Sequence, residues 1–524
     1  MSENGLNGHR NNLTSLQWKV GFINSEQKYL TAETFGHKIN ASGTGLKKRQ
    51  AWTLEQDPKE EVVYIRSHLG RYLSSDRYGN ITGECEEPGR SEKFSIEYND
   101  KGQWAIKNVE HGCYVGGIDN NVIGHNKPPT STEWWTLQLA IHPQVNLKNV
   151  NRKVYARLAA EEGEIQFTEV IPWGQDCLII LKFVEGKYAL VTCDNRYLHR
   201  DGHLVEELSP ETLFTIELKS GQISGLALKD VDGCYLTAVG HTAVMKARNR
   251  AITKDELFTI EDSHPQVTFT SHTGRIVSIK QGVDVSANQE EVTDRETFQL
   301  EFDKNSKKWA IRTVDNTYWA VASGTSGIQA TSKDIKNNCL FDLAWQREGS
   351  ITIKAFNNYY IYNKATGSLL ANSDAISEKE KFRIRLVNRP VLVMKGEFGF
   401  VAFKVPGSAK AEYVCNKSVY DLIFLEATER GIYHFKGHNN KYWSIGEDGS
   451  LFADSTGPTP FILEFRGQSM FTVKAPDGSF LKGEQNGIFK ATGKEDGLFG
   501  ESVDFHNYIP VLPLNVLFNY LPTT

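Results

Sequence analysis

Lys28-Tyr29-Leu30, Arg71-Tyr72-Leu73 and Cys113-Tyr114-Val115 are the first three copies of a motif that recurs twelve times along the chain. Neighbouring copies lie 38 to 43 residues apart, and a fixed period of this length indicates repeated supersecondary units. We therefore expect the repeat to define the fold, and its aromatic residues to supply the core. The ring position is occupied in turn by Tyr29, Tyr72, Tyr114, Tyr155, Tyr197, Tyr235, Ile276, Tyr318, Tyr360, Phe400, Tyr442 and Phe480.

A second motif, aromatic-x-aliphatic-acid, runs in step with the first and predicts β-strands. Its alternation of apolar and polar residues is typical of strands with one buried face. The segments between copies are rich in Gly, Asn and Asp, which favour turns. Helical periodicity does not persist beyond a turn or two, so we expect an almost entirely β protein. Copies of the motif begin at Trp52, Phe94, Phe214, Phe258, Phe298 and Phe461.

A third motif groups the repeats into blocks of about 120 residues. His142-Pro143-Gln144-Val145 recurs as His264-Pro265-Gln266-Val267, and more loosely as Asn388-Arg389-Pro390-Val391. Proline is tolerated at the first residue of a strand, where no ladder N–H is needed. Each block then begins with such a strand and holds three of the repeats.

Three four-stranded repeats that close into one barrel with a hairpin cap form a β-trefoil, and closure removes exposed strand edges. The sequence thus predicts an all-β fold of four tandem β-trefoil domains. We place them at 15–141, 142–263, 264–387 and 388–500. A disordered polar segment, 1–14, precedes them, and an atypical tail, 501–524, follows.

Composition and missing motifs exclude several classes of protein. The net charge of -5 argues against a general nucleic-acid binder, and no apolar stretch is long enough for membrane insertion. The seven cysteines include no C-x-x-C pair, which disfavours a metal or redox site and fits a reducing cytosol. No phosphate-binding loop, zinc-protease motif or nucleophile elbow occurs, so we expect neither an enzyme nor a cofactor.

Short basic clusters are the remaining candidates for function. Lys47-Lys48-Arg49 precedes the Trp52 strand, Arg152-Lys153 opens the second domain, and Lys404 lies in the fourth. A single cluster of this kind is more often a solvated turn than a site. Several clusters on a rigid acidic protein would suit a repeated acidic partner, because complementary charge steers association and sets register.

Long stretches of the chain resemble the fascins, and in character the sequence is closest to the arthropod members. The most similar stretches are 28–42, 46–55, 66–73, 142–146, 255–258, 286–289, 297–301 and 395–400, and the resemblance covers about residues 18 to 499. It implies four β-trefoils in two lobes, forming a rigid monomer that cross-links filamentous actin into tight parallel bundles. It also implies a place in the cytoplasm and cytoskeleton, in actin-rich projections such as filopodia.

The resemblance further implies the residues that contact actin. Val154 and Val405 stand where many relatives carry a basic residue. The implied contacts are Lys28, Lys47, Lys48 and Arg49 in the first domain, His142, Gln144, Arg152 and Lys153 in the second, and Lys395, Glu397, Lys404 and Lys482 in the fourth.

A departure from the family concerns regulation. Fascins commonly carry a serine directly before the Leu-Lys-Lys segment, and its phosphorylation switches bundling off, whereas this chain has Gly45 there. A phosphate adds about -1.5 to -2 charge and would neutralise the basic cluster. We therefore expect the switch to lie at Thr44 or Ser42, or to be lost.

Two alternatives stay open at this stage. The first is a carbohydrate-binding protein built from several β-trefoils, since lectin trefoils often carry Gln-x-Trp in each repeat. Gln50-Ala51-Trp52 is the single copy of that pattern at the repeat positions. The second is a regulatory or scaffold module of an enzyme, which the missing catalytic motifs do not exclude.

Overall fold

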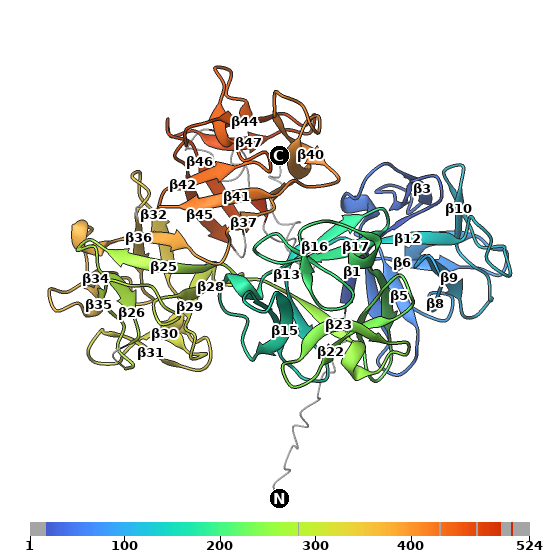
Figure 1. The fold of residues 1–524 in the computed structure, drawn as a ribbon, viewed down its shortest axis with the longest axis horizontal. Helices are drawn as coiled ribbons and strands as arrows, with labels where there is room; N and C mark the ends of the chain where they lie inside the picture. The colour runs from blue at the N-terminus through green and yellow to red at the C-terminus, as the bar shows by residue number, and fades with distance from the viewer. Residues whose placement is uncertain (1–16, 281, 429–430, 468–469, 494–504, 507–524) are drawn as a thin grey trace, which may run out of the picture.

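The protein is an all-β chain, seen here in a computed structural model that describes residues 17–280, 282–428, 431–467, 470–493 and 505–506 (Figure 1). The predicted disordered segment 1–14 lies outside the described residues, as does the predicted tail apart from 505–506. The described residues contain strands and short 3₁₀ helices but no α-helix, so the all-β prediction is confirmed.

Twelve strands of the first domain form three successive four-stranded repeats, and the second domain has the same order. The first domain contains β1 (Gln17–Ile23), β2 (Tyr29–Ala32), β3 (Ile39–Gly43), η1 (Lys48–Gln50), β4 (Trp52–Gln56), β5 (Val63–Arg66), β6 (Tyr72–Ser75), β7 (Ile81–Cys85), β8 (Phe94–Tyr98), β9 (Trp104–Asn108), β10 (Gly116–Ile118), β11 (Asn121–Ile123) and β12 (Trp134–Leu139). The second contains β13 (Gln144–Asn149), β14 (Tyr155–Ala159), β15 (Glu164–Glu169), η2 (Gln175–Cys177), β16 (Ile179–Val184), β17 (Lys187–Val191), β18 (Tyr197–Leu198), β19 (Leu204–Val205), η3 (Pro210–Thr212), β20 (Thr215–Lys219), β21 (Gly225–Lys229), β22 (Tyr235–Val239), β23 (Val244–Asn249), η4 (Lys254–Glu256) and β24 (Phe258–Asp262).

The third and fourth domains continue the pattern. The third contains β25 (Gln266–Ser271), β26 (Ile276–Ser278), β27 (Ser286–Gln289), β28 (Phe298–Asp303), β29 (Lys308–Arg312), β30 (Tyr318–Val321), β31 (Ile328–Ser332), η5 (Asn337–Cys339), β32 (Asp342–Trp345), β33 (Ile351–Lys354), β34 (Tyr360–Asn363), β35 (Leu369–Ser373), η6 (Glu378–Glu380) and β36 (Lys381–Leu386). The fourth contains β37 (Val391–Leu392), β38 (Lys395–Gly396), β39 (Gly399–Phe403), β40 (Tyr413–Lys417), β41 (Ile423–Ala427), β42 (Tyr433–Lys436), β43 (Tyr442–Ile445), β44 (Leu451–Ser455), β45 (Ile462–Gly467), β46 (Met470–Lys474), β47 (Phe480–Gly483), β48 (Phe489–Gly493) and β49 (Phe505–His506).

Each barrel closes by the same pairing. The last strand lies antiparallel between the first strands of the first and third repeats: β12 pairs with β1 and β9, β24 with β13 and β21, and β36 with β25 and β33. In the fourth domain β49 takes this place and pairs with β38 and β46. The closing strand is therefore supplied by the segment 501–524 that the sequence assigns to a tail, and it is only two residues long.

In each repeat, the residue directly after the ring position of the first motif points into the core. These residues are fully buried, whereas ring residues such as Tyr72, Tyr318 and Tyr442 are half-buried. The prediction that the recurring rings themselves supply the core is thus only partly right. The fully buried residues are Leu30, Leu73, Val115, Ala156, Leu198, Leu236, Val277, Trp319, Ile361, Val401, Trp443 and Leu481.

The tyrosine of the first motif and the acid of the second form one unit at the edge of the core. Tyr235 Oη donates a hydrogen bond of 2.7 Å to Glu217, and Lys229 Nζ lies 5.6 Å from the centre of the same ring. The phenol O–H thus gives the carboxylate a hydrogen-bond donor, and the lysine adds a cation–π contact with the ring. Equivalent Tyr–Glu bonds are Tyr72–Glu55, Tyr114–Glu97, Tyr155–Glu261, Tyr318–Glu301 and Tyr442–Glu426, at 2.6 to 2.9 Å.

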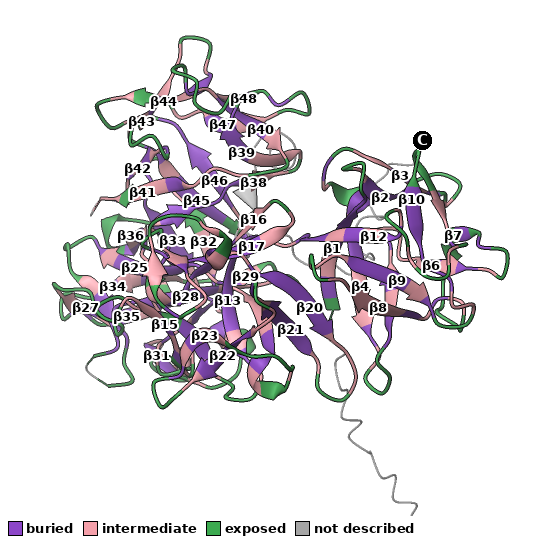
Figure 2. Ribbon diagram, turned by 45° about the vertical axis from the view of Figure 1, so that its right-hand side comes forward, coloured by how far each residue is buried: buried purple, intermediate pink, exposed green. Residues whose placement is uncertain are grey.

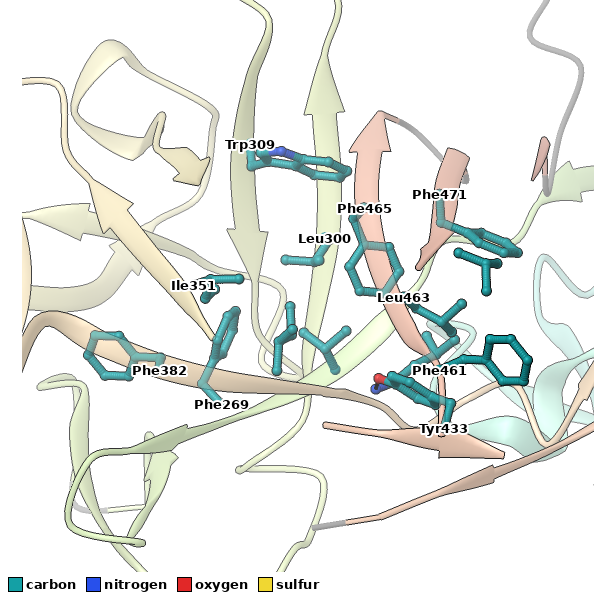
Figure 3. Close-up of a cluster of buried hydrophobic side chains, with 14 of the residues drawn as sticks. Phe269, Leu300, Trp309, Ile351, Phe382, Tyr433, Phe461, Leu463, Phe465 and Phe471 are labelled. Atoms are coloured by element: carbon teal, nitrogen blue, oxygen red, sulfur yellow. Dashed lines mark hydrogen bonds between the residues drawn. The ribbon is translucent and has the colours of Figure 1, made fainter. Parts of the chain in front are cut away.

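The four domains form two lobes. One hydrophobic cluster runs through the first and second domains, and another runs through the third and fourth. Figure 3 shows the second cluster, in which Phe269 and Trp309 of the third domain share one core with Phe461 and Phe465 of the fourth. Buried residues follow the strands, while exposed residues lie mainly in the turns (Figure 2).

Both lobes use the same bond at their domain junction. The backbone N–H of Leu139, at the end of the first domain, donates to Tyr188 Oη in the second domain. The N–H of Leu386, at the end of the third domain, donates to Tyr433 Oη in the fourth at 2.8 Å. The predicted arrangement in two lobes is therefore confirmed.

Candidate functional site

The basic loop, residues 44–49 before β4, is held by two buried side chains on its C-terminal side. Gln50 Nε2 donates to Thr31 Oγ1 at 3.1 Å, and Trp52 Nε1 donates to the carbonyl of Leu30 at 2.9 Å. These bonds fix the end of the loop, so Lys47, Lys48 and Arg49 project into solvent. Because Gln50 and Trp52 are both buried, the Gln-x-Trp pattern offers no surface for a glycan.

A depression of about 300 Å³ lies on this loop, lined by Thr31, Glu33, 42–45 and 47–50. Arg49 pairs with Glu33 at 2.6 Å across it. The hydrogen bond from Asn40 and the charge of Arg49 hold the pKa of the Glu33 carboxyl below its usual value. The Arg49 charge is thus partly compensated, which leaves Lys47 and Lys48 as the main positive groups.

The two candidate hydroxyls differ in access. Thr44 is exposed beside the depression, whereas Ser42 is half-buried and donates its hydroxyl to Asn40 Oδ1 at 2.7 Å. Thr44 is therefore the more accessible of the two to a kinase.

Gly45 brings the basic loop against the fourth domain. It is buried, and a Cβ at this position would lie 2.6 Å from Ser418 Oγ. Ser418 and Val419 also line a cleft of about 110 Å³ between the first, second and fourth domains, together with Leu46. Sequence reasoning missed Ser418, because only the docking of distant domains places it beside the loop.

Lys395 of the fourth domain enters the same cleft. It is half-buried, and its Nζ lies 4.9 Å from the centre of the Phe400 ring. Burial, with a smaller effect of the Lys19 charge, lowers the pKa of Lys395 to about 8. Glu397 next to it is exposed. The structure thus brings Lys395 and the basic loop to one junction.

The other predicted contacts lie elsewhere. Lys28 is half-buried in the β1–β2 turn, where its N–H donates to Asn24 Oδ1. Lys482 is half-buried in β47, and Lys404 is exposed with its Nζ 3.0 Å from Glu412.

A second exposed basic cluster, Arg152 and Lys153, lies in the β13–β14 turn. The guanidinium of Arg152 donates to the carbonyls of Ala238 and Gly240 at 3.1 Å, which ties the cluster to the β22–β23 turn. Figure 1 shows β22 and β23 on the side of the second domain that faces away from the fourth. The cluster is therefore separate from the basic loop and its junction.

His142 and Gln144 are corrections to the predicted contacts. They are 1% and 2% exposed, and both face the fourth domain. His142 Nε2 lies 2.9 Å from the carbonyl of Val393, and Gln144 bonds the backbone of Val391 and Val393. Side chains buried between two domains cannot touch a filament, so we assign both to the joining of the lobes.

Comparison with known proteins places the chain in a family. A model of the fascin domain matches residues 26–137, 145–260, 272–384 and 402–498, once in each trefoil. The chain belongs to the fascin family. Fascin-2 of Bos taurus is 40% identical over 91% of this chain and 96% of its own length. A fascin of Strongylocentrotus purpuratus is 37% identical over 92% of this chain and 97% of its own length.

Family membership agrees with two further predictions, that the fold is a fourfold array of β-trefoils and that the chain is not an enzyme. Among the described residues no three His, Cys, Asp or Glu side chains are grouped so that they could hold a metal ion. In the part of the chain that the structure describes, no helix has the length and apolarity needed to cross a membrane.

Proposed function

We propose that this fascin cross-links actin filaments into tight parallel bundles, as a monomer with separate basic surfaces. The observation that carries the proposal is that one joined body has two separate exposed basic clusters. Lys47–Arg49 follows Gly45, which lies against Ser418 of the fourth domain. Arg152–Lys153 is bonded to the β22–β23 turn, on the side of the second domain that faces away from the fourth (Figure 1). One filament contact binds, whereas two contacts that face different directions cross-link.

A rigid body supports this function, because a loose hinge would not fix the spacing of filaments. The first and second domains, which carry the two clusters, share one hydrophobic cluster and the bond from Leu139 to Tyr188. The fourth domain, which lies against the basic loop, and the third are joined to the second domain by further bonds. Gln144 joins the second domain to the fourth, and Gln266 in the same motif position joins the third domain to the second. Its side chain bonds the carbonyl of Pro172 at 3.0 Å and the N–H of Gly174 at 2.8 Å. Arg389, 2% exposed, donates to the carbonyl of Ser263 at 2.9 Å.

We infer that the partner is filamentous actin, because the exposed face of actin is acidic and repeats along the filament. Association through exposed lysines should weaken as ionic strength rises, since the Debye length is about 10 Å at 0.1 M salt and shorter above it. We place the protein in the cytoplasm and cytoskeleton, in actin-rich cell projections.

The proposal is tested with Lys48→Ala, Lys153→Ala and the double variant, with Lys59→Ala, another exposed lysine of the first domain, as the control. Single variants should bind filaments in high-speed sedimentation but form fewer bundles at low speed, because one contact is weakened. The double variant should lose most of its filament binding and most of its bundling, and the Lys59→Ala control should match the wild type. Variants that bundle like the wild type at every salt concentration would overturn the assignment.

A further inference from the structure

We propose that Phe35 is the apolar anchor of the filament contact that the basic loop steers. The inference rests on the proposed function and adds a residue that charge alone would not reveal. Phe35 is 89% exposed, more than any other large hydrophobic side chain among the described residues, of which Val170 at 76% comes next. A phenylalanine that contributes nothing to the core leaves its whole ring available to a partner.

The turn that carries Phe35 is closed by a backbone hydrogen bond. It runs from Glu33 to Lys38, and the N–H of Glu33 donates to the carbonyl of Lys38 at 2.9 Å. Gly36 and His37 both adopt left-handed backbone conformations, with φ of 71° and 49°. A Cβ added at Gly36 would meet no atom within 4 Å, so the tip of the turn stands in open space.

The same turn is tied to the basic loop through Glu33. One carboxylate oxygen accepts from Asn40 Nδ2 at 2.9 Å, and the other pairs with Arg49 Nη1 at 2.6 Å. Phe35 is thus presented beside a surface on which Lys38, Lys47 and Lys48 are exposed. An exposed aromatic side chain next to a basic surface resembles an interface hot spot, in which the aromatic residue becomes buried on binding and supplies affinity, while charges at the rim supply orientation.

This chemistry fits an acidic protein surface with an apolar depression large enough for one ring. An anionic membrane would also attract the lysines, but stable membrane attachment needs a larger apolar face or a second anchor. The turn presents a single aromatic ring, and Glu33 offsets part of the positive charge of the basic loop. Both features favour a protein partner over a membrane.

The test compares Phe35→Ala with Tyr78→Ala, which removes an exposed ring (62%) from another turn of the same trefoil. Filament affinity is measured by high-speed sedimentation over a range of salt concentrations. Phe35→Ala should raise the Kd by roughly tenfold or more, as loss of an interface anchor does. It should leave the thermal midpoint and the dependence of log Kd on log salt unchanged, because no charge is removed. Tyr78→Ala should match the wild type.

Other outcomes separate this inference from the proposed function. If the wild type bundles and Phe35→Ala has the wild-type Kd, the anchor is wrong and the proposed function stands. If the wild type does not sediment with filaments at all, the proposed function fails and the anchor with it. Flotation with vesicles containing phosphatidylserine tests the membrane: loss of vesicle binding by Phe35→Ala, with filament affinity unchanged, would overturn the inference.

Discussion

Replacing Gln144 with alanine should loosen the contact between the lobes and reduce bundling without removing a filament contact. Gln144 is 2% exposed, its Nε2 donates to the carbonyl of Val391 at 2.7 Å, and its Oε1 accepts from the N–H of Val393 at 2.9 Å. Truncation to alanine leaves the buried carbonyl of Val391 and the buried N–H of Val393 without the Gln144 side chain as a partner. At about 1–3 kcal/mol for each unsatisfied group, the contact loses about 2–6 kcal/mol.

The effect should be confined to the junction, because the trefoil cores are not touched. The fourth domain keeps its other bonds to the second, including Tyr420 Oη to the carbonyl of Leu181 at 3.2 Å. We therefore expect Gln144→Ala to be folded, with a lower urea midpoint and a larger radius of gyration by small-angle scattering. Because the fourth domain lies against the basic loop, a loosened junction should leave that surface without a fixed orientation relative to Arg152–Lys153. Bundling at low speed should therefore fall while single-filament binding at high speed is retained. Gln222→Ala, at an exposed site, is the control.

Two results would contradict this role of Gln144. Unchanged unfolding and unchanged bundling in Gln144→Ala would show that the bonds to Val391 and Val393 do not hold the lobes together. Loss of single-filament affinity with unchanged stability would show that Gln144 touches the filament, against its burial.

Three further predictions concern stability and regulation. Tyr235→Phe removes the bond to the buried Glu217 and should lower the free energy of unfolding by about 1.5–3 kcal/mol in chemical denaturation, as expected for a bond to a charged group; an unchanged value would mean that the Tyr–Glu unit adds no stability. Burial raises the pKa of Glu133 and Glu256, but hydrogen bonds from the threonine three residues upstream outweigh it and leave both pKa values lowered. Their stabilisation is complete above the unfolded pKa of about 4.3 and is lost as pH falls through the lower folded values, so the thermal midpoint should drop below about pH 4, and a midpoint that stays level would contradict this. Thr44→Glu adds negative charge beside the exposed lysines and should weaken filament binding; bundling equal to the wild type would show that Thr44 is not the switch.

The fold could be predicted from the sequence because the same structural motif occurs in repeat after repeat. Each trefoil repeat is a separate copy of one folding unit, so the aromatic motif recurs at twelve places and the strand motif runs in step with it at six of them. The sequence did not reveal that the two motifs bond each other, as Tyr235 and Glu217 do, because this contact depends on strand register.

The candidate site was less predictable, because a local pattern does not report which surfaces other domains cover. His142 and Gln144 look polar and accessible in the sequence, yet the docking of the fourth domain buries them. Lys47 and Lys48 were placed correctly in an exposed turn, since a short basic run before a strand has few other places to lie. Phe35 was missed because an isolated aromatic residue in a repeat protein is normally a core residue.

Low-speed sedimentation with filamentous actin, followed by electron microscopy of the pellet, measures whether the protein cross-links filaments into parallel bundles. We expect the wild type to pellet filaments at low speed as tight parallel bundles, and bundling to decline as salt is raised. Filaments that pellet only at high speed, or that form loose networks in the presence of the protein, would contradict a rigid monomer with two separate actin-binding surfaces.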